Sequence, residues 1–396
     1  MKDKNSLKAI IIILLVSFGH FWHDIFTAFV TPLMPVLKDN FGLSYLQTGW
    51  ILIAVRIPSL LSANIAGYAE KHSPKWFVIL CPLVTSISIT LLGVAPNYYV
   101  ILILVFISGL SAAGFHVPAP TLLKRSAPNR IGLAMTSFQI GGEAARTMGP
   151  LIVVLILSTI GLKNMYFLIP ISILVSLGFY YSFKKIDVSL DPKDKKNGSI
   201  ISTLKEGWWI FLLIGGISIH KSIITTLAKS FLPMFLQDSG YSLFKANGAL
   251  SIVQGATVAG VIVGGIFIDR IGAKKILYIV LSTATIFTSM FIFIPSLPIY
   301  PMLVLIGFFS FASMPAIYTL IQGRGFNFPT TANGIFMSLN FGITSLMLII
   351  AGKLSDMLTI STTYKVLGLG VLIGIPLIFM LFKTDVSENK EKTQQT

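Results

Sequence analysis

The sequence predicts an all-α integral membrane protein whose twelve transmembrane helices form two pseudo-symmetric six-helix bundles. Three observations predict this fold: an apolar composition, basic residues that alternate between loops, and an internal repeat. Of the 396 residues, 54% are hydrophobic and only 11% are charged. A soluble domain is far less apolar, so the chain has to cross a membrane many times. The net charge of +15 then reflects basic cytoplasmic loops rather than a nucleic-acid partner.

Apolar stretches of about twenty residues or more are long enough to cross a bilayer as helices. The first follows a basic N-terminus but lacks a small-residue cleavage pattern, so it is interpreted as a span and not as a signal peptide. The predicted spans are 8–37, 45–69, 76–95, 98–122, 131–158, 165–183, 207–236, 245–268, 275–295, 299–321, 334–353 and 362–382.

Lysine and arginine gather on one side of these spans. That side receives the N-terminus, the polar segment 184–206 and the C-terminus, whereas the opposite loops carry only isolated lysines such as Lys38 and Lys163. Because basic loops stay in the cytoplasm, both termini are predicted to be cytoplasmic, in a cell (inner) membrane.

The two halves of the chain repeat each other at an offset of about 198 to 201 residues, which indicates duplication. The matching pairs are Pro35 and Pro233, Gly42 and Gly240, Ser44 and Ser242, Glu70 and Asp269, Gly109 and Gly307, and Gln139 and Asn340. The predicted domains are an N-terminal bundle (1–183), a flexible cytoplasmic linker (184–206), a C-terminal bundle (207–383) and a disordered tail (384–396). Two such halves are the architecture of a secondary transporter with its site near the midplane.

The fifth span is unusually polar for a membrane helix. It carries Gln139, Glu143 and Arg146, and the pair Gly149 and Pro150 follows. Glu143 and Arg146 are three residues apart and therefore share one helix face. Ionisable side chains at this depth usually face a bundle interior or a water-filled cavity, and Gly-Pro permits a bend. The span is predicted to be a moving part beside a solute pathway.

The first span carries a second polar group. His20, His23 and Asp24 lie at i, i+3 and i+4, so they share one face. Intramembrane acids are usually functional, and Asp24 and Glu143 are predicted to couple transport to protons. Asp24 could instead be a structural carboxylate that a neighbouring helix satisfies, and either histidine could hydrogen-bond without titrating.

Two groups of residues resemble a known family. Gly265-Ile-Phe-Ile-Asp269-Arg270-Ile-Gly272 is similar to the loop motif of the major facilitator superfamily, and Gly67-Tyr-Ala-Glu70-Lys71 is a degenerate copy. Within that superfamily the first half resembles fosmidomycin-resistance efflux transporters. The residues that carry this resemblance are His20-Phe-Trp-His23-Asp24, Pro32-Leu-Met-Pro35, Phe41-Gly42-Leu-Ser44, Phe115-His116 and Ser137-Phe-Gln139-Ile-Gly141-Gly142 with Gly149-Pro150.

The resemblance implies the major facilitator fold and a set of gating residues. In the family, the acidic and basic loop residues lock the cytoplasmic gate, and an acid near a helix N-terminus is electrostatically favoured. The gating residues implied here are Glu70, Lys71, Gly149, Pro150, Asp269 and Arg270. This chain departs from the family at Val117-Pro118, where Pro-Glu is usual. Glu143 stands where the family has Asn, and Arg146 where it has a small residue.

The intramembrane cations outnumber the acids. Arg56, Arg146, Lys221 and Lys229 stand against Asp24 and Glu143, which favours a substrate that bears negative charge, although Lys229 could instead snorkel to the outer rim. The repeat places Asp24 opposite Lys221, and we expect the two to face each other across a central cavity. The predicted substrate-binding residues are His20, His23, Arg56, His116, Gln139, Arg146, His220 and Lys221.

The pattern as a whole predicts a proton-coupled exporter of a small anionic or amphipathic organic compound, acting as a monomer. No ATP motif is present, so the proton gradient is the expected energy source and no cofactor is expected. The alternative is a divalent-metal transporter, because imidazole and carboxylate suit such ions. Its ligands would come from His20, Asp24, His116, Glu143 and His220. A membrane enzyme is disfavoured, since no nucleophile has a recognisable partner at fixed spacing.

Overall fold

The computed structural model describes residues 2–61, 75–116, 118–127, 131–184, 200–324, 326–327 and 329–383. These residues are almost entirely helical, and no strand occurs among them. The chain divides into two compact units, Met1–Lys193 with Leu243–Ser251 and Asp194–Ser242 with Ile252–Thr396. Among the described residues, ten helices are long and apolar enough to cross a membrane, and Tyr45–Leu61 and Ile360–Leu372 are shorter apolar helices. Each of these twelve overlaps one predicted span.

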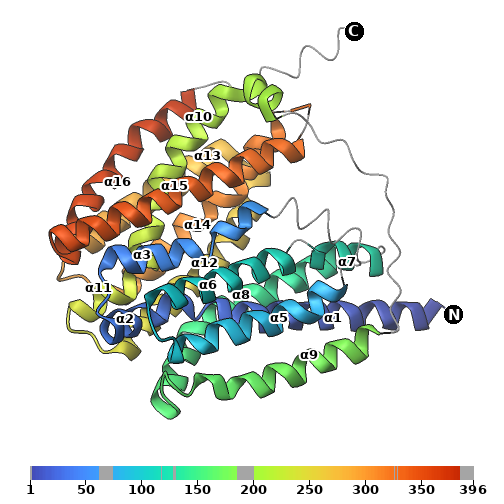
Figure 1. The fold of residues 1–396 in the computed structure, drawn as a ribbon. Helices are drawn as coiled ribbons and strands as arrows, with labels where there is room; N and C mark the ends of the chain where they lie inside the picture. Colours follow the sequence, from blue (N-terminus) through green and yellow to red (C-terminus); the bar gives the residue numbers. More distant parts are fainter. Residues whose placement is uncertain are drawn as a thin grey trace, which may run out of the picture. The chain divides into compact units, whose positions relative to one another are not determined.

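The first unit contains the helices of the first half of the chain (Figure 1). They are α1 (Lys2–Thr27), α2 (Val30–Phe41), α3 (Tyr45–Ala54), η1 (Ile57–Leu61), α5 (Lys75–Thr90), η2 (Leu91–Val94), α6 (Tyr98–His116), α7 (Pro118–Ser126), α8 (Ile131–Thr159), η4 (Met165–Leu168) and α9 (Ile169–Phe183).

Proline explains why the first two predicted spans are each broken. A proline ring clashes with the carbonyl four residues earlier and has no N–H to donate. Pro32 thus opposes a continuous helix at Ala28, and α1 ends at Thr27. Pro58 likewise opposes the carbonyl of Ala54, where α3 ends. As far as the structure describes them, each of these spans therefore consists of two helical pieces.

Helices α1 and α8 lie in direct backbone contact because glycines line their interface. A Cβ atom at Gly141 would stand 2.3 Å from the carbonyl oxygen of Ser17, and one at Gly149 would stand 2.6 Å from Ala28 Cβ. Only glycine permits such an approach. Helix α8 stays helical through Pro150. The buried core beside this interface includes Phe115, Phe138, Phe179 and Phe183.

The second unit contains the helices of the second half (Figure 1). They are α10 (Ile200–Thr225), η5 (Thr226–Ser230), α11 (Leu232–Asp238), α12 (Leu243–Ile271), α13 (Ala273–Phe293), α14 (Ile299–Gly323), α15 (Pro329–Met357) and α16 (Ile360–Lys383). A π-helix, η5, lies inside the seventh span. The first turns of α12 belong to the first unit, where the Asn247 side chain donates to the Pro32 carbonyl at 3.4 Å.

The repeat is visible in the turns that follow α2 and α11. Gly42 has φ 59° and Gly240 has φ 86°, a left-handed backbone that favours glycine. The next residue closes each turn in the same way: the Leu43 N–H donates to the Lys38 carbonyl, and the Tyr241 N–H to the Leu236 carbonyl, both at 2.9 Å. This bond is the helix-ending pattern of the Schellman motif. The sequence match at these positions therefore corresponds to a shared backbone conformation.

Candidate functional site

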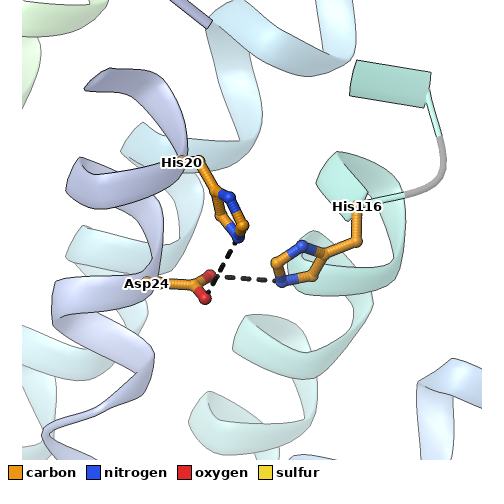
Figure 2. A group of neighbouring side chains, drawn as sticks. All are labelled: His20, Asp24 and His116. Carbon is orange, nitrogen blue, oxygen red and sulfur yellow. Dashed lines mark ion pairs between the residues drawn. The ribbon is translucent and has the colours of Figure 1, made fainter. Parts of the chain in front are cut away.

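The first unit holds a buried carboxylate, Asp24, that faces four nitrogen-bearing side chains. Asp24 lies on α1 and is 1% exposed. Its Oδ1 is 2.9 Å from His23 Nδ1 and 3.1 Å from His116 Nε2. Its Oδ2 is 2.7 Å from Arg146 Nη1 and 3.2 Å from His20 Nε2. Figure 2 shows His20 and His116 converging on the carboxylate from α1 and from the end of α6.

A chain of hydroxyl groups fixes the ring of His23. The Ser111 hydroxyl donates to the Cys81 carbonyl at 2.7 Å, and the Thr85 hydroxyl donates to Ser111 Oγ at 2.8 Å. Thr85 Oγ1 has then used its only proton, so it can only accept from His23 Nε2, 2.9 Å away. The Nε2 atom of His23 therefore carries a proton. Its Nδ1, which faces Asp24, carries one only in the charged ring. Cys81, whose carbonyl ends this series of hydrogen bonds, has a buried side chain.

His20 is held in a similar way by the backbone of α8. Its Nδ1 lies 2.6 Å from the Phe138 carbonyl, which can only accept, so Nδ1 carries a proton. Its Nε2 is buried without a well-aligned hydrogen bond and stands 3.2 Å from Asp24 Oδ2. Gly142 leaves room for the ring, because a Cβ atom there would lie 2.4 Å from His20 Cε1.

These contacts determine how many protons the cluster needs. When neutral, His20 and His23 both present a lone pair to Asp24, and an ionised carboxylate also offers only lone pairs. Both contacts are attractive only when the three groups hold two protons in addition to those on His20 Nδ1 and His23 Nε2. The two protons can lie on both rings, or one on a ring and one on the carboxyl group. Each of these two protons would turn one repulsive contact of Asp24 into an attractive one.

Arg146 links Asp24 to a second acid. Besides Asp24, its guanidinium binds Glu143, with Nη2 2.5 Å from Oε1. Gln139 Nε2 donates to the same Glu143 oxygen at 2.9 Å. The structure thus brings together Gln139, Glu143 and Arg146 of α8 with the polar residues of α1. The Arg146 side chain is 32% exposed and that of Glu143 22%, so this end of the cluster is accessible while Asp24 is not.

Part of the cluster has the geometry of a metal site. Ligand atoms of His20, Asp24 and His116 all lie within 4.8 Å of one another. Of the two further residues in the predicted ligand set, Glu143 binds Arg146, and His220 belongs to the second unit, so its part in a metal site stays a prediction. The Arg146 guanidinium also occupies Asp24 Oδ2, so a divalent cation would have to displace a positive group.

The second unit repeats the histidine arrangement with a lysine in the position of the acid. His220 Nε2 is 3.1 Å from Thr285 Oγ1, whose proton goes to the Leu281 carbonyl at 2.8 Å, so Nε2 again carries a proton. Lys221 follows His220 as Asp24 follows His23. It is 5% exposed, and its Nζ lies 5.1 Å from the centre of the Phe311 ring.

The predicted pairing of Asp24 with Lys221 stays a prediction, because the two residues belong to different units. Within its own unit Asp24 already has a cationic partner, Arg146. Arg56 is half-buried at the junction of α3 and η1.

The predicted gating residues are only partly visible. Glu70 and Lys71 lie outside the described residues, and so does the side chain of Asp269. Arg270 is exposed in the last turn of α12, and Gly149 is buried within α8 beside Pro150. Their gating role stays a prediction.

Several residues that shape the site were missed by sequence reasoning. Thr85 and Ser111 orient His23, and Phe311 lies beside Lys221. A signal for the threonine was present: Thr85 and Thr285 are 200 residues apart, which matches the repeat offset, and His23 and His220 are 197 apart, close to it. A comparison of the two halves for polar residues at matching positions could therefore have identified the threonines that contact these histidines.

A polytopic helical protein of two repeat-related units, with ionisable side chains buried inside a membrane bundle, has the architecture of a membrane transporter. The chain belongs to the Major Facilitator Superfamily, whose sequence model matches residues 16–336. The predicted family and its twelve-helix fold are thereby confirmed. Members of this family are transporters and not enzymes, so the chain has a small-molecule substrate and is embedded in a membrane.

Relatives and solved structures agree with this assignment. The fosmidomycin resistance protein of Escherichia coli (strain K12) is 24% identical over 381 residues, 92% of this chain and 91% of that protein. Multidrug resistance protein MdtG of Escherichia coli (strain SMS-3-5 / SECEC) is 25% identical over 370 residues, 82% of this chain and 86% of that protein. A bacterial homologue of the human lysosomal transporter Spinster, in an inward-facing, occupied conformation, superposes with a TM-score of 0.78. It is 16% identical, and the match covers 96% of this chain and 98% of that structure.

Proposed function

We propose that this protein is a proton-coupled exporter of a small anionic or amphipathic organic compound. Relatives named for fosmidomycin resistance and for multidrug resistance support efflux as the direction. The observation that carries the proton coupling is the set of contacts around Asp24, which are all attractive only when two protons are shared with His20 and His23. Asp24 and Glu143 are the proposed proton-coupling residues.

The contacts of Arg146 suggest how protons act on the structure. A neutral carboxyl group holds a guanidinium less strongly than a carboxylate does. Protonation of Asp24 therefore weakens its contact with Arg146, and this contact joins α1 to α8. The number of bound protons changes the attraction between two closely packed helices. Such a change is the proposed driving element for alternating access by the two units.

Substrate contact is proposed for the accessible side of the same cluster. Arg146 and Gln139 offer N–H donors to an anionic group, and His116 is 38% exposed beside them. His20 and His23 are buried and act through Asp24. Arg56, His220 and Lys221 remain proposed substrate contacts. Positive loops support cytoplasmic termini, and bacterial relatives support an inner-membrane location.

The proposal is tested with purified protein in liposomes that contain a pH-sensitive dye. Organic phosphonates and carboxylates are added to the wild type, to Asp24→Asn and to Glu143→Gln. Lys353→Gln, which alters an exposed lysine of α15, serves as the control. We expect proton movement driven by an organic anion in the wild type and the control, and its loss in Asp24→Asn. Equal movement in Asp24→Asn and the wild type would refute the assignment of the coupling acid.

The second candidate function is divalent-metal transport, which the proximity of His20, Asp24 and His116 favours. The same liposomes are challenged with Mn²⁺, Fe²⁺ and Zn²⁺. Proton movement that follows a metal but no organic anion, and that disappears in His116→Ala, would replace the exporter assignment with metal transport.

A further inference from the structure

Two lysines of the seventh span share one aromatic ring in the second unit. Lys221 Nζ lies 5.1 Å from the centre of the Phe311 ring, and Lys229 Nζ lies 3.5 Å from it. Lys229 Nζ also donates to Gln254 Oε1 at 2.8 Å. The lysines come from α10 and η5, Gln254 comes from α12 and Phe311 from α14. Lys229 thus contacts side chains of two neighbouring helices, α12 and α14.

The π-helix η5 explains why both lysines face the same side. In a regular α-helix, residues eight apart differ by about 80° around the axis, since each turn takes 3.6 residues. A π-turn absorbs one extra residue, so Lys229 lies about where the seventh residue would, roughly 20° from Lys221. The Phe231 N–H bonds the Thr226 carbonyl, five residues back, at 2.9 Å. Such single π-turns occur frequently at functional sites.

Neighbouring residues stabilise this irregular turn. Pro233 has no N–H for the carbonyl of Lys229, four residues earlier, and so opposes a regular helix. The Tyr364 hydroxyl donates to the Leu227 carbonyl at 2.7 Å, which satisfies a carbonyl within the π-turn. The turn is therefore a specified feature, held by side chains outside it.

Lys221 lacks a carboxylate partner in the described part of the chain. It is 5% exposed, and no described carboxylate oxygen lies within 4.0 Å of its Nζ. The face of an aromatic ring attracts a cation, but a buried ammonium group normally requires a charged partner. A negatively charged ligand would supply it. In the first unit, by contrast, Arg146 already has two acids.

We propose that Lys221, Lys229, Gln254 and Phe311 form a binding site for an oxyanion carried on a small apolar or aromatic group. Two ammonium groups suit a phosphonate or phosphate better than a singly charged carboxylate. Gln254 accepts from Lys229 through Oε1, and its amide nitrogen has N–H donors to offer an anion. The Phe311 ring provides the apolar contact. This inference rests on the proposed function in one respect: the bound anion is taken to be part of the exported compound.

The site is tested by calorimetric titration of the purified full-length protein with phenylphosphonate, and separately with inorganic phosphate. The variants are Lys221→Gln and Lys229→Gln, with the exposed Lys353→Gln as the matched loss of charge. We expect each of the first two to weaken phenylphosphonate binding at least tenfold, and the control to leave it unchanged. Phe311→Leu should weaken phenylphosphonate but not inorganic phosphate.

Arginine variants keep the test decisive if a glutamine variant fails to fold. Lys221→Arg and Lys229→Arg retain the charge and should retain binding. Unaltered affinity in folded Lys221→Gln and Lys229→Gln would overturn the proposal, as would the absence of binding to the wild type. Phenylphosphonate binding that depends on the lysines but moves no protons would support this site and refute the proton-coupled function. Proton movement that an organic anion drives equally in the wild type, Lys221→Gln and Lys229→Gln would support the proton-coupled function and refute this site.

Discussion

Replacing Thr85 by valine removes the hydroxyl group that fixes the ring of His23 and changes the shape of the side chain very little. In the wild type, Thr85 Oγ1 accepts from His23 Nε2 at 2.9 Å and donates to Ser111 at 2.8 Å. A buried donor left without its acceptor costs about 1–3 kcal/mol. We expect the free energy of unfolding in detergent to fall by about that amount.

The same substitution should change the tautomer of His23. Without Thr85, His23 can carry its proton on Nδ1 and donate to Asp24 while remaining neutral, so the cluster needs one proton fewer. The preference for the Nε2-protonated ring should decrease about tenfold for each 1.4 kcal/mol lost. Nitrogen NMR of protein labelled at its five histidines, assigned with His23→Ala, measures this ratio.

The repeat supplies a matched control, Thr285→Val. It removes the equivalent bond to His220, 3.1 Å long, in a place where Asp24 has no counterpart acid. It should lower stability to a similar extent and leave both the tautomer of His23 and proton coupling unchanged. If Thr85→Val preserved the wild-type tautomer ratio, the hydroxyl chain would not control His23 and the proton count argued from it would fail.

Two further substitutions test the packing and charge around Asp24. Arg146→Ala should lower the free energy of unfolding, measured by denaturant titration, by about 3 kcal/mol, because it leaves Asp24 buried without its cationic partner. Adding Asp24→Asn to this variant should recover part of the loss. Equal losses in the single and double variants would argue against the ion pair. Gly142→Ala should lower the thermal midpoint, since its Cβ would stand 2.4 Å from the His20 ring and such overpacking costs about 1–3 kcal/mol. Gly178→Ala, in open space on α9, should be neutral or stabilising, and an equal loss there would contradict the packing argument.

The sequence predicted the spans, and it matched the two glycines that end α2 and α11, because these signals depend on local properties. Apolar length defines a membrane helix, and Gly42 and Gly240 mark a backbone that other residues rarely adopt. The proline effects were harder to predict. Pro58 lies just after the break at the end of α3, whereas α8 continues through Pro150. The difference depends on which neighbouring helices pack against each turn, and spacing along the chain does not contain that information.

The candidate site was predictable only within single helices. Helical spacing placed His20 and Asp24 on one face, and it joined Glu143 to Arg146 on another. The contact between Asp24 and Arg146 spans 122 residues of sequence, and no local pattern reports it. Local spacing did not indicate Thr85 either, since a threonine in an apolar helix commonly bonds the backbone of its own helix, and only a comparison of the two halves could have pointed to it. That Arg146 pairs with Asp24 emerges only from the packing of α1 against α8.

Cys81 makes the protein convenient for site-directed labelling. It is the only cysteine in the chain, and its side chain is buried. A buried thiol reacts slowly with labelling reagents. Cysteines introduced at exposed helix ends such as Tyr99 of α6 and Met357 of α15 can therefore be labelled selectively with the native residue left in place. Spin labels or fluorophores attached there would report, in the otherwise unaltered protein, how the distance between the two units changes when a substrate or a pH gradient is applied.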